Sequence, residues 1–160
     1  MNPIAWLISL ALPACGFPAA EGLPVPLPMD TAHIVRPATP NTSLAAPEGF
    51  SPQPDIVTPS YRLPPERLFA LVQEVAASQP NTYRAALFSD RLQVHYVARS
   101  AMFNFPDLVM VQVGQTGADS SNIILYSRSV YGRSDFGANR KRVEAWLAAL
   151  RAKLPPSSER

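Results

Sequence analysis

Cysteine and histidine are scarce in this chain, and their scarcity excludes several kinds of site. The one cysteine, Cys15, rules out an internal disulfide framework and a cysteine-based zinc site. The two histidines, His33 and His95, lie far apart among scattered acids and do not suggest metal binding. The Gly-x-x-x-x-Gly-Lys phosphate loop and the Gly-x-Ser-x-Gly nucleophile motif are both absent. We therefore expect no metal, no cofactor and no identifiable catalytic residue.

Long apolar runs are also missing. The run Ile4–Ala14 is shorter than the about 20 apolar residues that a membrane-spanning helix needs. The sequence Leu12-Pro-Ala-Cys15 follows the outline of a bacterial lipoprotein signal, although Pro13 is unusual there and no basic residue precedes the run. We expect an exported protein attached through its N-terminus to the periplasmic side of a bacterial membrane. Lipidation of Cys15, an uncleaved interfacial segment and a plain signal peptide are the alternatives.

Proline and charge divide the chain into unlike parts. Residues 1–65 hold 14 of the 18 prolines and a net charge of −2, whereas residues 66–160 carry +4. This small positive charge does not indicate nucleic-acid binding, and export makes nucleic acid an unexpected partner. The alternating prolines of Gly22-Leu-Pro-Val-Pro-Leu-Pro28 favour extended polyproline geometry. We predict a signal or lipoprotein-like segment (1–15), a proline-rich tether (16–47) that can lie partly along the domain, and one domain (48–160).

Periodicity after residue 64 predicts two helices with strands between them. Pro64-Pro65-Glu66 opens a helix, because proline suits the first turn and an acid suits its positive end. The strand-like runs are Thr82–Phe88, Leu92–Arg99, Leu108–Val113 and Ile123–Ser127, with a polar loop from Gly114 to Asn122 between the last two. The last helix carries Val143, Trp146, Leu147, Leu150 and Leu154 at helical spacing, and Pro155 ends it.

This α-β-β-β-β-α order predicts a two-layer α+β fold. We expect a four-stranded antiparallel meander flanked by an N-terminal and a C-terminal helix, preceded by a proline-rich extended arm. Within the run Leu92–Arg99, apolar and polar residues alternate as in a half-buried strand. The alternation places His95 on the sheet surface, which we favour over a role in a Ser-His-Asp site.

The stretch from Tyr126 to Arg142 is where we expect a functional site. It combines five basic residues, one acid, three serines and one asparagine at a strand end, a glycine-containing loop and a helix start. Cations near a helix N-terminus oppose the helix dipole by about 0.3–1 kcal/mol each. An acid, either Asp107 or Asp135, or a bound anion should therefore offset Arg140, Lys141 and Arg142.

Two interpretations of this junction follow. In the first, Arg128, Ser134, Asn139 and Arg140 build a pocket for an anion, since free amides and arginines both favour anions. In the second, the arginines and acids form an internal polar network that pins the loop and the helix. Strand alternation sends Arg128 to the opposite face from Ser127 and Ser129, so Arg128 can serve a different surface from the two serines.

Two blocks of sequence carry a family resemblance. The first is Arg128-Ser-x-x-x-Gly132-x-Ser134-Asp135-x-Gly137-x-Asn139-Arg140-x-Arg142, and the second is Tyr96-Val-Ala-Arg99-Ser100 followed by Phe105-Pro-Asp107. Together they resemble the signature of the domain of unknown function 1499 family, found in bacterial and plastid envelope proteins, over about residues 36–152. Many members have a Pro-Asn-Cys-type motif where this chain has Pro40-Asn41-Thr42. The resemblance implies an α+β domain and a shared polar cluster of Arg99, Asp107, Arg128, Asp135, Asn139 and Arg140, but no reaction.

The function that we favour from the sequence is a non-enzymatic envelope module. It would bind an anionic small molecule, a lipid head group or a protein partner at the 126–142 junction. One alternative is a hydrolase or transferase that acts on an anionic substrate with Asp107 or Asp135 as base. Another is a purely structural polar network with an unknown interaction role. The apolar loop Met102–Phe105 is expected in the core or as a lid, or else as a patch facing a membrane or a partner.

Overall fold

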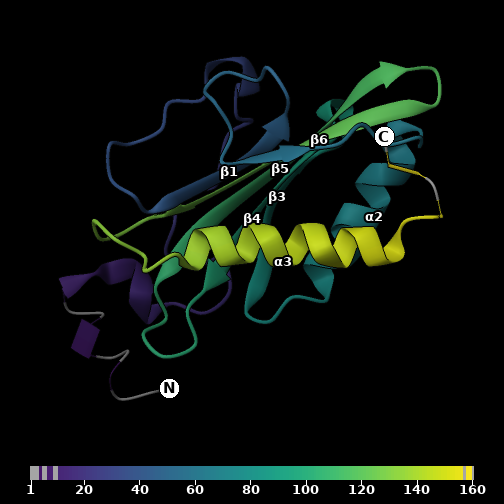
Figure 1. The fold of residues 1–160 in the computed structure, drawn as a ribbon. Coiled ribbons are helices and arrows are strands. Elements are labelled where there is room, and N and C mark those ends of the chain that lie inside the picture. The colour runs from purple at the N-terminus through teal and green to yellow at the C-terminus, as the bar shows by residue number, and fades with distance from the viewer. Residues whose placement is uncertain (1–3, 5–6, 9–10, 157, 160) are drawn as a thin grey trace.

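The computed structural model describes residues 4, 7–8, 11–156 and 158–159, and its centre is a six-stranded sheet (Figure 1). The strands are β1 (Thr42–Pro47), β2 (Ile56–Thr58), β3 (Thr82–Phe88), β4 (Gln93–Arg99), β5 (Pro106–Gly117) and β6 (Ser120–Ser129). The helices α2 (Pro65–Ala77) and α3 (Ala138–Lys153) pack on one face of the sheet. Short 3-10 helices are η1 (Pro13–Gly16), η2 (Thr31–His33) and η3 (Ser89–Arg91).

The sheet is mixed, and its strand order is β2-β1-β6-β5-β4-β3. Strands β3 to β6 form an antiparallel meander, β1 pairs antiparallel with β6, and β2 pairs parallel with β1. The predicted four-stranded antiparallel meander is therefore wrong as a description of the sheet. It contains β3 to β6 but omits two strands and the parallel pair.

The two omitted strands lie among prolines, which is why the sequence did not reveal them. Proline is tolerated at strand ends, and Pro47 is the last residue of β1. The strand forms through distant pairing, with Leu44 opposite Tyr126 of β6. Asp55 then brings the chain back beside β1, because its carboxylate accepts a hydrogen bond from the Leu44 amide (2.8 Å) and its own amide donates to the Leu44 carbonyl (2.8 Å).

The β5–β6 hairpin is longer than predicted. The expected polar loop from Gly114 to Asn122 is mostly strand, with Gly114 opposite Asn122 and Gln115 opposite Ser121. Gln115 and Thr116 are exposed at this end of the sheet. Their polarity reflects solvent contact on a protruding hairpin rather than a loop.

The main core lies between the helices and the sheet. Tyr96 of β4 and Trp146 of α3 meet edge to face, with ring centroids 5.5 Å apart. Pro65 occupies the first turn of α2 as the sequence predicts. The buried side chains of this core come from both helices and from the strands: Ala45, Tyr61, Leu68, Phe69, Leu71, Val72, Val75, Ala76, Val94, Tyr96, Ala98, Val109, Val111, Val113, Ile123, Leu125, Val143, Trp146 and Leu150.

The opposite face of the sheet is covered by the N-terminal arm, which we define as residues 22–35. All seven residues of β4 are buried, so the expectation of a half-exposed strand with His95 on the surface is wrong. Leu23, Pro26 and Met29 are half-buried while their neighbours are exposed. This spacing of three matches the three residues per turn of polyproline II. The arm thus lays one edge of an extended helix against the sheet.

The side chain of Gln93 attaches the arm to β4. Its Oε1 accepts a hydrogen bond from the Met29 amide (2.7 Å), and its Nε2 donates to the Met29 carbonyl (2.9 Å). Gln93 is fully buried and also donates to Gln112 of β5 (2.9 Å). The side-chain amide therefore bonds Met29 as the main chain of a neighbouring strand would.

Truncating the core at Leu125 tests this packing. Leu125 of β6 is buried beneath the helices, and we expect Leu125→Ala to lower the free energy of unfolding by about 2–5 kcal/mol. Urea denaturation at neutral pH measures the loss. The control is Leu87→Ala in β3, whose side chain is 41% exposed and should cost clearly less. Equal losses in the two variants would contradict the assigned core.

Candidate functional site

Asn139 is the centre of a polar network between α3 and the sheet. Its side chain is completely buried in the first turn of α3. Its Nδ2 lies 2.7 Å from the Asp135 carboxylate, 3.0 Å from the Asn41 carbonyl oxygen and 2.9 Å from Ser129 Oγ. Its Oδ1 accepts a hydrogen bond from Ser127 Oγ at 2.6 Å. One amide side chain thus joins the helix to β6, to the residue before β1 and to the preceding loop.

Arg142 extends this network to β5. Its Nη2 forms an ion pair of 2.8 Å with Asp107, whose side chain is nearly buried. Its Nη1 donates to Asn139 Oδ1 (2.9 Å) and to Ser127 Oγ (3.1 Å). We call Asn41, Asp107, Ser127, Ser129, Asp135, Asn139 and Arg142 the Asn139 network. Every polar group named in it already has a partner inside the protein.

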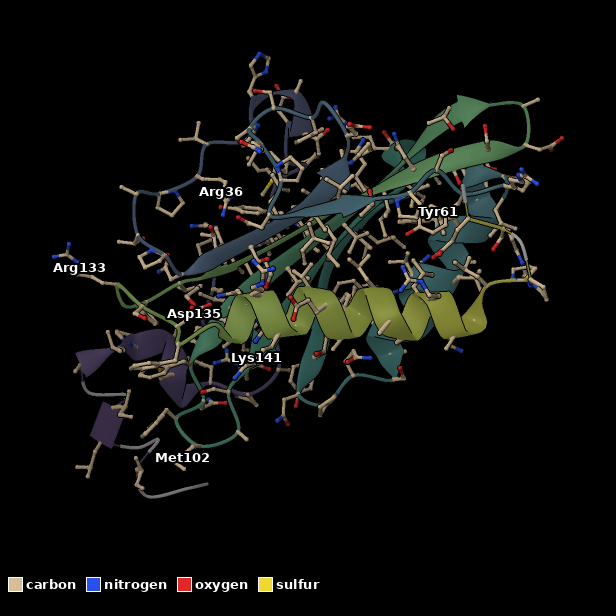
Figure 2. The ribbon with its side chains drawn as sticks, in the orientation of Figure 1. Arg36, Tyr61, Met102, Arg133, Asp135 and Lys141 are labelled. Carbon is tan, nitrogen blue, oxygen red and sulfur yellow. The ribbon has the colours of Figure 1, made fainter. Side chains whose placement is uncertain are left out.

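Asp135 caps the start of α3, where Figure 2 labels it near Lys141. Its carboxylate accepts hydrogen bonds from the main-chain amides of Gly137 (2.9 Å) and Asn139 (2.8 Å). Burial alone would raise the pKa of Asp135, but the hydrogen bonds from Asn139 and Gly137 hold it below its ordinary value. The Asp135 carboxylate therefore offsets the positive charges of the basic residues at the start of α3. This is one of the offsets expected from the sequence.

The predicted site residues fall into separate places. Asp107, Asp135 and Asn139 lie together in the Asn139 network. Arg140 is exposed and pairs with Glu144 (2.9 Å), and Ser134 is exposed and accepts a hydrogen bond from the Phe136 amide. Arg128 points to the other face of the sheet. The four residues of the expected anionic pocket are not assembled at one point, and the contacts are those of the internal network.

Sequence reasoning missed Arg142 as a site residue. The missed signal is helical spacing: Asn139, Arg142, Val143 and Trp146 follow i, i+3, i+4 and i+7. This stripe faces the sheet, so Arg142 belongs to it. Arg140 directly follows Asn139 in the sequence, so it does not belong to this stripe.

Arg99 holds the N-terminal segment instead of joining the Asn139 network. The buried guanidinium donates to the main-chain carbonyls of Ala14 (2.7 Å), Ala19 (2.6 Å) and Glu21 (2.7 Å). Asn104 adds hydrogen bonds to the carbonyls of Cys15 and Phe17. These contacts attach residues 14–21 beside the end of β4, directly before the arm.

Cys15 is buried in η1 under this attachment. Burial raises the pKa of its thiol, and the nearby Arg99 offsets part of that rise. Lipidation of Cys15 stays a prediction, and it requires η1 to leave its position so that the thiol is accessible. Part of the predicted segment 1–15 lies outside the described residues. No helix in the described part of the chain is both long and apolar enough to cross a membrane.

A cavity of about 610 Å³ lies between the arm and the sheet face opposite the helices. His95, Met110 and Tyr126 are cross-strand neighbours on β4, β5 and β6 and form part of its floor. Leu108 and Arg128, also cross-strand neighbours, form the next row. The arm from Leu23 to Met29 supplies the roof. A second cavity of about 350 Å³ shares Met29, Tyr126 and Arg128 with the first, so the two adjoin.

Three polar groups line this otherwise apolar space. The Tyr126 hydroxyl is buried, and no described group forms a hydrogen bond of ordinary length and angle with it, although the Thr42 hydroxyl lies close enough to affect it. Burial raises the pKa of Tyr126, and Arg128, Arg36 and Thr42 offset that rise only in part. Arg128 is exposed at the rim. Desolvation lowers the pKa of His95 to about 4, so its imidazole is neutral at neutral pH.

Most of the chain matches the model of a known protein family. Residues 35–150 match the model of the family described as "Protein of unknown function (DUF1499)". The chain belongs to the DUF1499 family. The resemblance seen in the sequence is thereby confirmed, and the matched region includes all six strands and the Asn139 network. No curated protein matches the chain.

Potential metal ligands are dispersed in this DUF1499 domain. Within the described ranges, no group of three or more His, Cys, Asp or Glu side chains is placed to hold a metal ion. Asp107 is occupied by Arg142, and Asp135 by main-chain amides. In the cavity under the arm, by contrast, Arg128 makes no ion pair with a described residue.

Neighbouring substitutions separate the roles of Asn139 and Arg140. Asn139→Ala removes the buried side-chain hydrogen bonds that join α3 to Asn41, Ser127 and Asp135, and we expect a loss of at least about 2 kcal/mol in unfolding free energy. Arg140→Ala removes one exposed ion pair and should change it by less than about 1 kcal/mol. Chemical denaturation of both variants checks this. Similar losses would show that the Asn139 network does not anchor the helix.

The lowered pKa of His95 predicts a specific pH dependence. The folded protein disfavours the imidazolium, so this contribution to stability is complete above pH 6.5 and is lost as the pH falls from 6.5 towards 4. Its full size is about 3 kcal/mol. His95→Gln does not titrate, so its unfolding free energy should fall less than that of the parent over this range. Parallel pH profiles of the two proteins would contradict the burial of a neutral histidine.

Proposed function

We propose that this protein is a binding module for an anionic amphiphile, a molecule with an apolar body and an anionic head group. The observation that carries the proposal is the cavity of about 610 Å³ under the arm. It combines an apolar lining with an arginine at its rim and a buried hydroxyl that has no partner among the described residues. Small-molecule sites have this size and this mixture of apolar walls with a few polar groups.

The apolar body would lie between the sheet and the arm. Leu108 and Met110 provide the floor, and Leu23, Pro26 and Met29 face it from the arm. The prolines add apolar surface without main-chain donors. A single acyl chain, whose carbons need no hydrogen bonds, suits such walls better than a sugar or a nucleotide does.

The head group would lie near Arg128 and Tyr126. Arg128 makes no ion pair with a described residue, and its guanidinium can take a carboxylate or phosphate in two parallel hydrogen bonds. The Tyr126 hydroxyl would gain the partner that it lacks. A ligand of this class also suits a protein attached to a membrane, as the N-terminal sequence predicts.

The enzymatic alternative gains no support from its two proposed bases. Asp107 lies against Arg142, and the hydrogen bonds to Asp135 hold its pKa below the ordinary value. A carboxylate whose pKa is lowered is a weak proton acceptor, which disfavours Asp135 as a base. Both also lie on the helix side of the sheet, away from the cavity. Binding without chemistry is the function that these placements favour.

Dodecanoate tests the proposal, with isothermal titration calorimetry on the full chain below the micelle concentration. We expect saturable binding to the parent protein. Arg128→Ala should weaken it about five- to tenfold, because a partly exposed ion pair contributes about 1 kcal/mol. Leu108→Trp should also weaken it, because the larger side chain narrows the cavity at its floor.

The matched control is Arg67→Ala on α2, an exposed arginine on the other side of the sheet. It should bind dodecanoate as the parent does. The proposal fails if the parent shows no saturable binding. It also fails if Arg67→Ala and Arg128→Ala weaken binding equally, which would indicate a charge effect without a site.

A further inference from the structure

Exposed apolar side chains gather at the end of the molecule where the N-terminal segment lies. They come from three separate stretches of the chain, namely the N-terminal segment, the β4–β5 loop and the β6–α3 loop. The members are Leu7, Phe17, Met102, Phe103 and Phe136. We call this set the apolar end.

Hydrogen bonds tie these stretches together. The Tyr131 hydroxyl accepts from the Ala14 amide (3.3 Å), and Asn104 donates to the carbonyls of Cys15 and Phe17. The N-terminal segment therefore bridges the β4–β5 loop and the β6–α3 loop. Figure 2 shows Met102, Asp135 and Lys141 around the same end of the sheet.

Phe136 is the most informative member. Its side chain is 91% exposed, and its φ of +53° lies in the left-handed region, which bulky residues rarely adopt. Neither the exposure nor the backbone conformation benefits the packing of the domain. An aromatic side chain kept in this position points to a contact outside the chain.

Two basic side chains lie at the same end of the molecule as the apolar end (Figure 2). Arg133 and Lys141 are exposed and make no ion pair with a described residue. The acid of the same loop, Asp135, is directed to main-chain amides. Apolar side chains with adjacent cations are the pattern of surfaces that lie at the boundary between lipid head groups and acyl chains.

We propose that the apolar end docks on a membrane surface that carries anionic lipids. Phe136, Met102 and Phe103 enter the head-group boundary, while Arg133 and Lys141 contact lipid phosphates. Ala14, the last residue of the apolar stretch that the sequence analysis singled out, lies at the same end, so attachment by the N-terminus and docking by the domain would act at one surface. This inference is independent of the cavity and of the ligand proposed for it.

Vesicle titration of the full chain tests the docking. The measured quantity is the partition coefficient on vesicles of phosphatidylcholine with phosphatidylglycerol and on phosphatidylcholine alone. We expect Phe136→Asn to lower it about tenfold on the mixed vesicles, because one buried aromatic side chain is lost. Asparagine tolerates a left-handed backbone, so the fold is retained. The control is Leu87→Asn at the far end of β3, which should partition as the parent does.

A charge-reversed protein, Arg133→Glu with Lys141→Glu, gives the second measurement. Its partitioning should fall at least about tenfold on anionic vesicles and much less on phosphatidylcholine. The control Arg91→Glu, in η3, should have no such effect. The proposal is overturned if Phe136→Asn partitions as the parent does, or if charge reversal acts equally on both vesicle types. Phe136→Asn should keep the dodecanoate affinity, and Arg128→Ala should keep vesicle binding, so the two proposals can fail separately.

Discussion

A buried asparagine amide at the start of α3 is the constraint on which the arrangement of this domain depends. Asn139 has no solvent to replace a lost hydrogen bond, so the positions of Asn41, Ser127 and Asp135 are fixed together by it. These hydrogen bonds fix the position of α3 along the sheet. The ion pair between Arg142 and Asp107 adds a contact from α3 to β5. These polar groups are satisfied internally on the helix side of the sheet, whereas the cavity proposed as a binding site lies on the opposite side, under the arm.

The parts of the fold that local sequence determines were predictable. The bounds of β3 agree with the prediction, and α2 begins at Pro65 as its opening residues indicate. The parts that depend on distant pairing were not. Strand β1 exists because Leu44 finds Tyr126 more than eighty positions later, and β2 exists because Asp55 returns the chain to β1. Strands of three and six residues that lie among prolines are too short for a periodic sequence pattern to indicate such pairing.

In the candidate site, too, the features set by local sequence were predictable and those set by distant contacts were not. The sequence identified Asp107 and Asp135 because a helix start rich in cations needs an acid nearby, and it identified Asn139 as a hydrogen-bonding residue at that helix start and through the family resemblance. It could not show that Arg99 would bind main-chain carbonyls about eighty residues away, since a carbonyl leaves no mark in the side-chain pattern. The cavity at His95 was hidden for a related reason, because it depends on where a proline-rich arm comes to rest.

The arm is fastened on both sides of its proline run, by the Arg99 contact with Glu21 and by the Gln93 contact with Met29. The prolines between these two points already restrict the main chain. Folding has therefore removed most of the conformational entropy of the roof before any ligand arrives. A molecule that enters the space beneath it does not have to order a loop, and its affinity is not reduced by that cost. Exchange of the proposed ligand would require only that the Arg99 or the Gln93 contact opens. Every hydrogen bond between the strands of the sheet could stay intact.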